Sequence, residues 1–426
     1  MTTLNEPRPA TGPDTAEAPP RPAAHRPGAM LDSLTGLRGL AAILVFCFHF
    51  TTFEFVFSPS GGLTFASLTR PRFLTMSGNF AVGSFFILSG FVLAMTTREG
   101  TSMANFCAKR IGKLCPVYLV TTVIAVVAIL LIGMPVTVGN IALHLTLLQS
   151  WVPYQDIYTG INPVTWSLST EVFFYLLFPF ALFLVRRLRT RTLFVLLAGV
   201  VVAEFVVPLY AMHFFTVLPS AGHETYFNTA SNGGDLVYWL TLPFPPYRFL
   251  EFLSGMICCL LVTRRAVPRI PLSVAWGVGV VAYVIGTYSP GPLQRTAVGL
   301  VPLSLLVMAL AQADFAGRRS LLRRRLFVTL GKLSYGMYAI QLLVFLPSEP
   351  FVLKGLGALT GVSAATLHDP LWRIPIGAAY FAFIAVLAMP IYRYIEVPAY
   401  DYAKRLYRSR PPSELFANDV RAREAA

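Results

Sequence analysis

Charged side chains are scarce in this chain. Asp, Glu, Lys and Arg make up 13% of its 426 residues, against about 25% in soluble globular domains. Hydrophobic residues make up 55% and gather in long unbroken runs. The scarcity of charge excludes an ordinary soluble domain. The unbroken runs exclude a transmembrane β-barrel, which needs alternating apolar and polar positions.

Cysteine is also rare, and no metal-ligand spacing is found. The five cysteines are Cys47, Cys107, Cys115, Cys258 and Cys259. Their odd number and irregular spacing indicate no disulfide framework. The histidines of the predicted outer regions also lack the spacing of a metal site. The sequence therefore predicts neither a structural disulfide nor a metal.

The apolar runs predict an all-α fold, a polytopic membrane bundle of about ten transmembrane helices. The expected spans are about 34–53, 80–97, 116–134, 166–185, 192–212, 248–263, 271–288, 296–312, 327–346 and 374–395. Segment 140–151 is too short to span and is expected at the membrane interface. Residues 1–29, rich in Pro, Ala and Thr, are expected to form a disordered tail. A membrane domain over 30–402 and a cytoplasmic tail over 403–426 follow.

The net charge of +14 is explained by topology, with no nucleic-acid partner. With the N-terminus inside, the predicted cytoplasmic segments hold 25 Lys or Arg and the outer segments hold 5. Short basic loops orient membrane helices in this way. Both termini are therefore expected in the cytoplasm.

The first span carries two ionisable residues, Arg38 and His49. Eleven residues separate them, so both fall on nearly the same helix face, about 16 Å apart along the axis. Ionisable residues within a span are candidates for a functional site. The alternative is an arginine that reaches the membrane surface and a histidine bonded to a neighbouring helix.

Glu171 lies near the start of the fourth span, at the end of the string WSLSTE. The predicted topology places it about as deep as His49, on the outer side. A carboxylate beside an imidazole can orient it and raise its basicity. The alternative is an interhelical hydrogen bond that only fixes packing.

A basic segment, NFCAKRIGKLCP, follows the second span. Arg110 and Lys113 are three residues apart, which places them on one face of a helix. Close to Arg38 they would form a cationic cluster suited to the phosphates of coenzyme A or of a nucleotide sugar. The alternative is ordinary cytoplasmic charge. Glu396, at the inner end of the last span, is expected to pair with a nearby base.

Six strings resemble, in order, the motifs of the acyltransferase family 3 membrane proteins, which O-acylate carbohydrates and related acceptors. They are LDSLTGLRGLAA followed by His49, GSFFILSGFVLA, KRIGKLCPVY, WSLSTEVFFYLLFP, LGKLSYGMYAIQ and YIEVPAYDYAK. The resemblance runs from Leu31 to about Tyr402. It implies an integral membrane enzyme, in the plasma membrane of a bacterium.

The resemblance also implies acyl-CoA as co-substrate, with no bound cofactor. It implies an acyl group, most often acetyl, moved to a hydroxyl of a polysaccharide or a macrolide-type metabolite. The implied residues are His49 and Glu171 for catalysis, Arg38, Arg110 and Lys113 for donor binding, and Ser89, Trp166, Ser169, Tyr335 and Gln341 as pocket residues. Two positions depart from the family: Lys113 stands where arginine is more frequent, and Gln341 where many members have histidine.

Two other classes stay open. A transporter or exporter of a glycan or small molecule could use the same intramembrane Arg, His and Glu as a relay. The sequence has no detectable inverted halves and no matched helix breaks, which disfavours this class. A flippase-like scaffold of a glycan machine is the third reading, and it predicts no consumption of acyl-CoA.

Overall fold

The computed structural model describes residues 31–57, 63–67, 72–97, 101–131, 136–214 and 235–408, and the structural statements below refer to these residues. The tail expected over 1–29 lies outside them, as do residues 409–426. The expected boundary at residue 402 falls within a described helix, α16 (Val397–Arg408).

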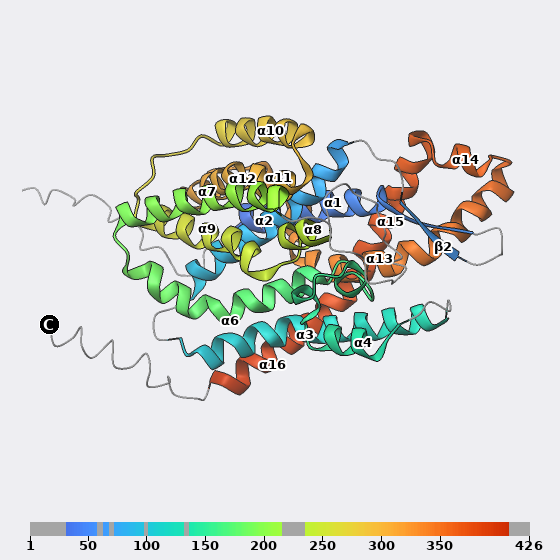
Figure 1. Ribbon diagram of the computed structural model, residues 1–426, viewed down its shortest axis with the longest axis horizontal. Coiled ribbons are helices and arrows are strands. Elements are labelled where there is room, and N and C mark those ends of the chain that lie inside the picture. The colour runs from blue at the N-terminus through green and yellow to red at the C-terminus, as the bar shows by residue number, and fades with distance from the viewer. Residues whose placement is uncertain are drawn as a thin grey trace, which may run out of the picture. The chain divides into compact units, whose positions relative to one another are not determined.

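Ten main helices correspond one to one with the ten expected spans (Figure 1). They are α1 (Asp32–Phe50), α2 (Arg72–Thr96), α3 (Met103–Leu131), α6 (Trp166–Arg187), α7 (Thr190–Phe214), α9 (Pro245–Thr263), α10 (Leu272–Tyr288), α12 (Ala297–Phe315), α13 (Arg325–Thr360) and α15 (Pro370–Ile391). Within the described residues, nine helical stretches are long and apolar enough to cross a membrane, and α10 is shorter. The expected polytopic helical bundle is confirmed.

Shorter elements join these helices. They are α4 (Val138–Leu145), η1 (Gln149–Trp151), α5 (Gln155–Tyr158), α8 (Asp235–Thr241), α11 (Gly291–Arg295), η2 (Leu321–Arg323), α14 (Ala364–Leu367) and the π-helical turn η3 (Tyr392–Glu396), which leads directly into α16. A hairpin of β1 (Phe53–Phe57) and β2 (Leu63–Ser67) follows α1, with Phe55 opposite Phe65. This hairpin lies in the connection between the expected spans 34–53 and 80–97.

Helix α1 packs against α13 and α2. Glycines make the contact with α13 close: a Cβ atom at Gly331 would lie 1.9 Å from the carbonyl oxygen of Thr35. Small residues allow such backbone approach between membrane helices. Farther along, Gln341 of α13 and Val45 of α1 line one small pocket. The two helices therefore run in the same direction, and Arg38 and His49 sit on a closely packed pair.

The segment before α6 folds back into the bundle. The side-chain amide of Asn162 donates to the carbonyl oxygen of Ala339 on α13 at 3.0 Å. Ser169 Oγ donates to the carbonyl oxygen of Leu147 at 2.6 Å, and Tyr118 of α3 donates to that of His144 at 2.5 Å. Residues 136–165 are thus tied to α3, α6 and α13, which determines where α6 begins.

Candidate active site

A basic pocket lies where α1, α3, α13 and η3 meet. Its empty space, part of which is open to solvent, is about 840 Å³, and its charged lining consists of Arg38, Arg110, Lys113, Lys332 and Glu396. Arg110 and Lys113 both lie on the continuous helix α3. The structure therefore brings together the three basic residues that the sequence singled out.

Two guanidinium groups in this pocket have spare donors. The buried Nε atoms of Arg38 and Arg110 have no hydrogen-bond partner among the described residues. Arg110 lies over the ring of Tyr175, with 5.9 Å between the guanidinium carbon and the ring centroid. Guanidinium groups of this kind bind oxyanions well, because several N–H donors point at one acceptor group.

A second cavity, the aromatic pocket, adjoins the basic pocket. Its empty space, part of which is open to solvent, is about 530 Å³. Its lining comprises Arg38, Val82, Phe85, Phe86, Ser89, Ser167, Leu168, Glu171, Ser334, Tyr335 and Tyr338. Arg38, Ser334 and Tyr335 line both pockets. The two cavities therefore meet at Arg38.

Glu171 lies in the aromatic pocket and is held by two hydroxyl groups. Ser89 Oγ of α2 donates to its Oε1 at 3.0 Å, and the hydroxyl of Tyr175, one turn along α6, donates to the same atom. Its partner Ser89 lies one turn beyond Phe85, whose ring packs against Arg38, so Glu171 lies toward the Arg38 end of α1. The expected depth beside His49 is therefore wrong.

The error arises from the start of α6. Ser167 Oγ lies 2.9 Å from the hydroxyl of Tyr338 on α13, so α6 begins well inside the bundle. The positive-inside rule gives the side of a loop but not its depth. It could not show that residues 136–165 fold back among the helices.

His49 lies in the last turn of α1 and is only 8% exposed. Its ring centroid is 5.7 Å from that of Phe53 and 6.4 Å from that of Tyr338. Tyr338 also lines the aromatic pocket. His49 therefore lies beside a residue of the aromatic pocket, although His49 itself lines neither pocket.

The end of α1 is fixed by a buried ion pair that the sequence analysis missed. Arg373 of α15 pairs with Glu349 of α13 and donates to the carbonyl oxygen of Phe50 at 2.9 Å. Phe50 follows His49 directly. The arginine lies 323 residues away in sequence, so no spacing could have revealed the contact.

The remaining pocket residues hold parts of the fold together. Tyr335 donates to the carbonyl oxygen of Leu114 at 2.6 Å, which joins α13 to α3. Gln341 is buried, and its amide donates to the carbonyl oxygen of Tyr338 at 3.3 Å. Trp166 packs edge-on against Phe86 of the aromatic pocket. Ser169 contacts Leu147, as described above. Of the expected pocket residues, Trp166, Ser169 and Gln341 do not line the two pockets, and Gln341 lines the small pocket beside Val45 instead.

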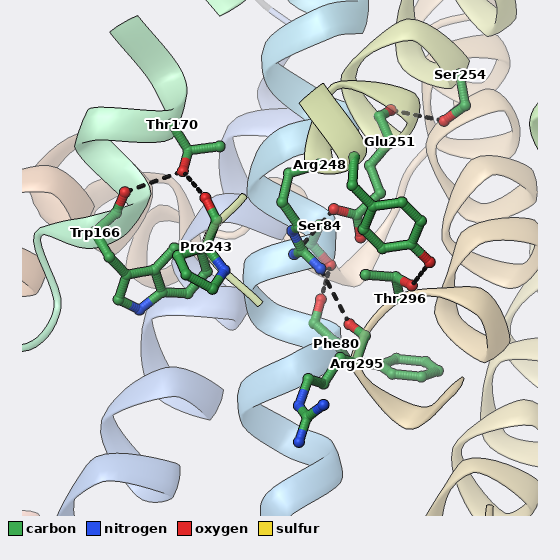
Figure 2. A network of polar contacts seen from close by, with 11 residues as sticks. Phe80, Ser84, Trp166, Thr170, Pro243, Arg248, Glu251, Ser254, Arg295 and Thr296 are labelled. Carbon is green, nitrogen blue, oxygen red and sulfur yellow. Dashed lines mark hydrogen bonds and ion pairs between the residues drawn. The ribbon is translucent and has the colours of Figure 1, made fainter. Parts of the chain in front are cut away.

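A separate polar network supports the wall of the aromatic pocket (Figure 2). Arg248 pairs with Glu251 at 2.9 Å and donates to the carbonyl oxygen of Arg295 at 3.3 Å. Its guanidinium carbon lies 5.0 Å from the ring centroid of Phe86. An aromatic face attracts a cation in this position. The ion pair thus packs directly behind a residue of the pocket.

The described residues offer no metal centre. No group of three or more His, Cys, Asp or Glu among them could hold a metal ion, and all five cysteines are free thiols.

Most of the chain is similar in sequence to known acyltransferases. Residues 31–393 match the family model described as an acyltransferase domain. Acyltransferase MdmB of Streptomyces mycarofaciens is 36% identical over 320 residues, 74% of this chain and 79% of that protein. The putative acetyltransferase ORF330 of Acidianus two-tailed virus is 25% identical over 334 residues, 77% of this chain and 86% of that protein. No solved structure matches the chain.

Proposed function

The chain belongs to acyltransferase family 3 and is a multi-pass membrane acyltransferase, and on that premise we propose its donor, its acceptor and the roles of its residues. The donor is acyl-CoA, with acetyl as the expected acyl group. The acceptor is a hydroxyl of a carbohydrate or of a sugar-bearing metabolite. The relative named as a putative acetyltransferase supports the choice of acetyl.

The observation that carries the donor assignment is the junction of the two pockets at Arg38. Coenzyme A has an anionic nucleotide end and an uncharged pantetheine arm. The basic pocket suits the phosphates, because Arg38, Arg110 and Lys113 supply charge and the two arginines also have unpaired donors. The aromatic pocket suits the arm, whose amide N–H groups can donate to Glu171. This arrangement carries the thioester toward Tyr338 and His49.

His49 acts in this proposal as the general base. It takes the proton of the acceptor hydroxyl while that oxygen attacks the thioester carbon. The C–S bond then breaks, and the thiolate of CoA recovers the proton from the imidazolium. In an alternative order, His49 first accepts the acyl group and then passes it to the acceptor, which would leave a trappable acyl-enzyme.

The basic loops give the proposed orientation in the plasma membrane. The Arg38 end of α1 faces the cytoplasm, where acyl-CoA is made, and the His49 end faces outward. Glu171 then belongs to the donor side of the site. Its proposed role changes from orienting the imidazole to holding the pantetheine arm.

Release of CoA thiol by the purified protein tests this function. With acetyl-CoA and a glycan or macrolide acceptor, the wild-type protein should release CoA and acetylate the acceptor in equal amounts. A folded protein that transports a glycan and leaves acetyl-CoA intact would favour the exporter class instead. Mass spectrometry of extracellular glycans and metabolites, with and without the gene, would identify the acceptor.

A further inference from the structure

Glu396 is a buried carboxylate inside the basic pocket. It ends the π-helical turn η3, is 3% exposed, and lines the pocket with Arg38 and Lys113. Its Oε1 atom is buried and has no hydrogen-bond partner in the described part of the chain. No described cation forms an ion pair with it within 4.0 Å, but Lys113 and Arg38 attract its carboxylate across the pocket, so the expected base is present without a direct contact.

The backbone at Glu396 forms a π-helical turn in place of an α-helical one. A π-helical turn is wider than an α-helical turn, is rare, and often marks a functional site. Here the turn lies between Pro390 and Pro398, each of which removes a backbone donor from the helix. Oε1 of Glu396 lies 3.6 Å from the position that a Cβ atom would take at Gly336. The carboxylate is thus held close to α13, within the pocket lining.

The charges around Glu396 define its effect on an anionic ligand. Arg38, Arg110, Lys113 and Lys332 supply positive charge to the pocket, and Glu396 supplies the one negative charge in its described lining. A phosphate group that enters must therefore approach a carboxylate as well as the cations. Like charges in a partly desolvated pocket repel more strongly than in water. A carboxylate at this position is therefore expected to weaken the binding of phosphates.

Weaker binding of the phosphates would help the enzyme to release CoA after acyl transfer. Free CoA carries the same phosphates as acyl-CoA, so the basic pocket binds substrate and product alike. Such uniform binding does not accelerate the chemical step, and very tight binding delays product release.

We propose that Glu396 is a built-in counter-ion that competes with the phosphates of the donor and so speeds the release of CoA. The carboxylate partly neutralises the cations when the pocket is empty and repels the phosphates when it is filled. This inference rests on the proposed function, because it takes CoA as the ligand of the basic pocket.

The test compares the wild-type protein with Glu396→Gln, which keeps the size of the side chain and removes its charge. Calorimetry with CoA and with adenosine 3′,5′-bisphosphate measures affinity at low and high salt. We expect the variant to bind both ligands about tenfold more tightly, with a steeper loss of affinity as salt increases. We expect kcat to fall severalfold while the rate of a single turnover stays unchanged, because only release is slowed.

Three further variants complete the test. Asp401→Asn removes a negative charge from α16 at a residue that does not line the pocket, and it should leave the affinity unchanged. Glu396→Asp keeps the charge and should behave as the wild type. Glu396→Ala removes the charge by another route and should reproduce the tighter binding, so the test does not depend on one variant folding.

Two results would overturn the inference. If folded Glu396→Gln or Glu396→Ala binds CoA equally or more weakly, the carboxylate does not compete with phosphates, while the proposed function stands. If the wild-type protein binds neither CoA nor the bisphosphate, the donor assignment itself fails, and the inference fails with it.

Discussion

Ser89 Oγ of α2 donates a 3.0 Å hydrogen bond to Oε1 of Glu171 on α6. The bond joins two segments that are 82 residues apart in sequence, and both residues line the aromatic pocket. It fixes the carboxylate on the Arg38 side of the cavity. The proposed position of the pantetheine arm depends on this arrangement.

Substitution of Ser89 tests that relationship. Ser89→Ala removes a hydrogen bond to a charged group, which typically contributes about 1.5–3 kcal/mol. We expect the KM for acyl-CoA to rise about tenfold, because the carboxylate that holds the arm becomes mobile. Steady-state kinetics in detergent or nanodiscs would measure the change.

Ser84→Ala is the matched control on the same helix. Ser84 is buried, and its hydroxyl donates to the carbonyl oxygen of Phe80 within α2 at 2.7 Å. This variant should leave the KM nearly unchanged. An equal rise in both variants would mean that Ser89 acts only through helix packing.

The basic pocket predicts different results for its arginine and its lysine. Arg110→Ala should raise the KM for acyl-CoA about tenfold, because a phosphate loses a charged donor. Lys113→Arg should lower the KM, because a guanidinium can bind a phosphate with two hydrogen bonds. Arg393→Ala, at an exposed residue of η3, is the control and should have no effect. A rise in KM for Lys113→Arg would show that this position needs the compact ammonium group.

The contact between Arg373 and Phe50 predicts that one pair of substitutions can restore stability without restoring activity. Arg373→Met leaves Glu349 buried without its cation, a change that typically costs about 3–5 kcal/mol. We expect a lower melting temperature and a lower kcat. In the double variant Arg373→Met with Glu349→Met, the unpaired charge is gone, so the melting temperature should recover. The kcat should stay low, because Phe50 still lacks its donor and His49 is less well positioned. Recovery of both quantities would assign the ion pair a purely structural role.

His144 predicts a loss of stability in acid. It lies in α4, where burial lowers the pKa of its imidazole from 6.5 to about 4. The unfolded chain therefore binds a proton at a higher pH than the folded chain does. Stability from this group is complete above about pH 6.5 and is lost as the pH falls toward 4, by up to about 3 kcal/mol. Melting temperatures at pH 7.5 and 4.5 should show a smaller acid loss in His144→Gln than in the wild type. An equal loss would mean that His144 is not the group responsible.

The sequence predicted the helices well and the depth of the site less well. The ten spans follow from continuous apolar runs, and Arg110 and Lys113 share a pocket because a three-residue spacing on one helix keeps them together. Glu171 was misplaced because its depth depends on how residues 136–165 pack. Tyr175 could have been noticed, since it lies one helical turn after Glu171. The contacts of Tyr338 and Arg373 bring distant segments together and carry no local signal.

In the proposed mechanism, His49 is the group that acts on an acyl donor delivered from the basic pocket. The most direct measurement is the rate of CoA release from acetyl-CoA, with acceptor present, by the wild type and by His49→Gln, together with the Kd of each for CoA. General base catalysis contributes about 10²- to 10⁴-fold, so the rate should fall by at least a hundredfold while the Kd stays within about twofold. A folded His49→Gln protein that transfers acetyl groups at the wild-type rate would contradict the account.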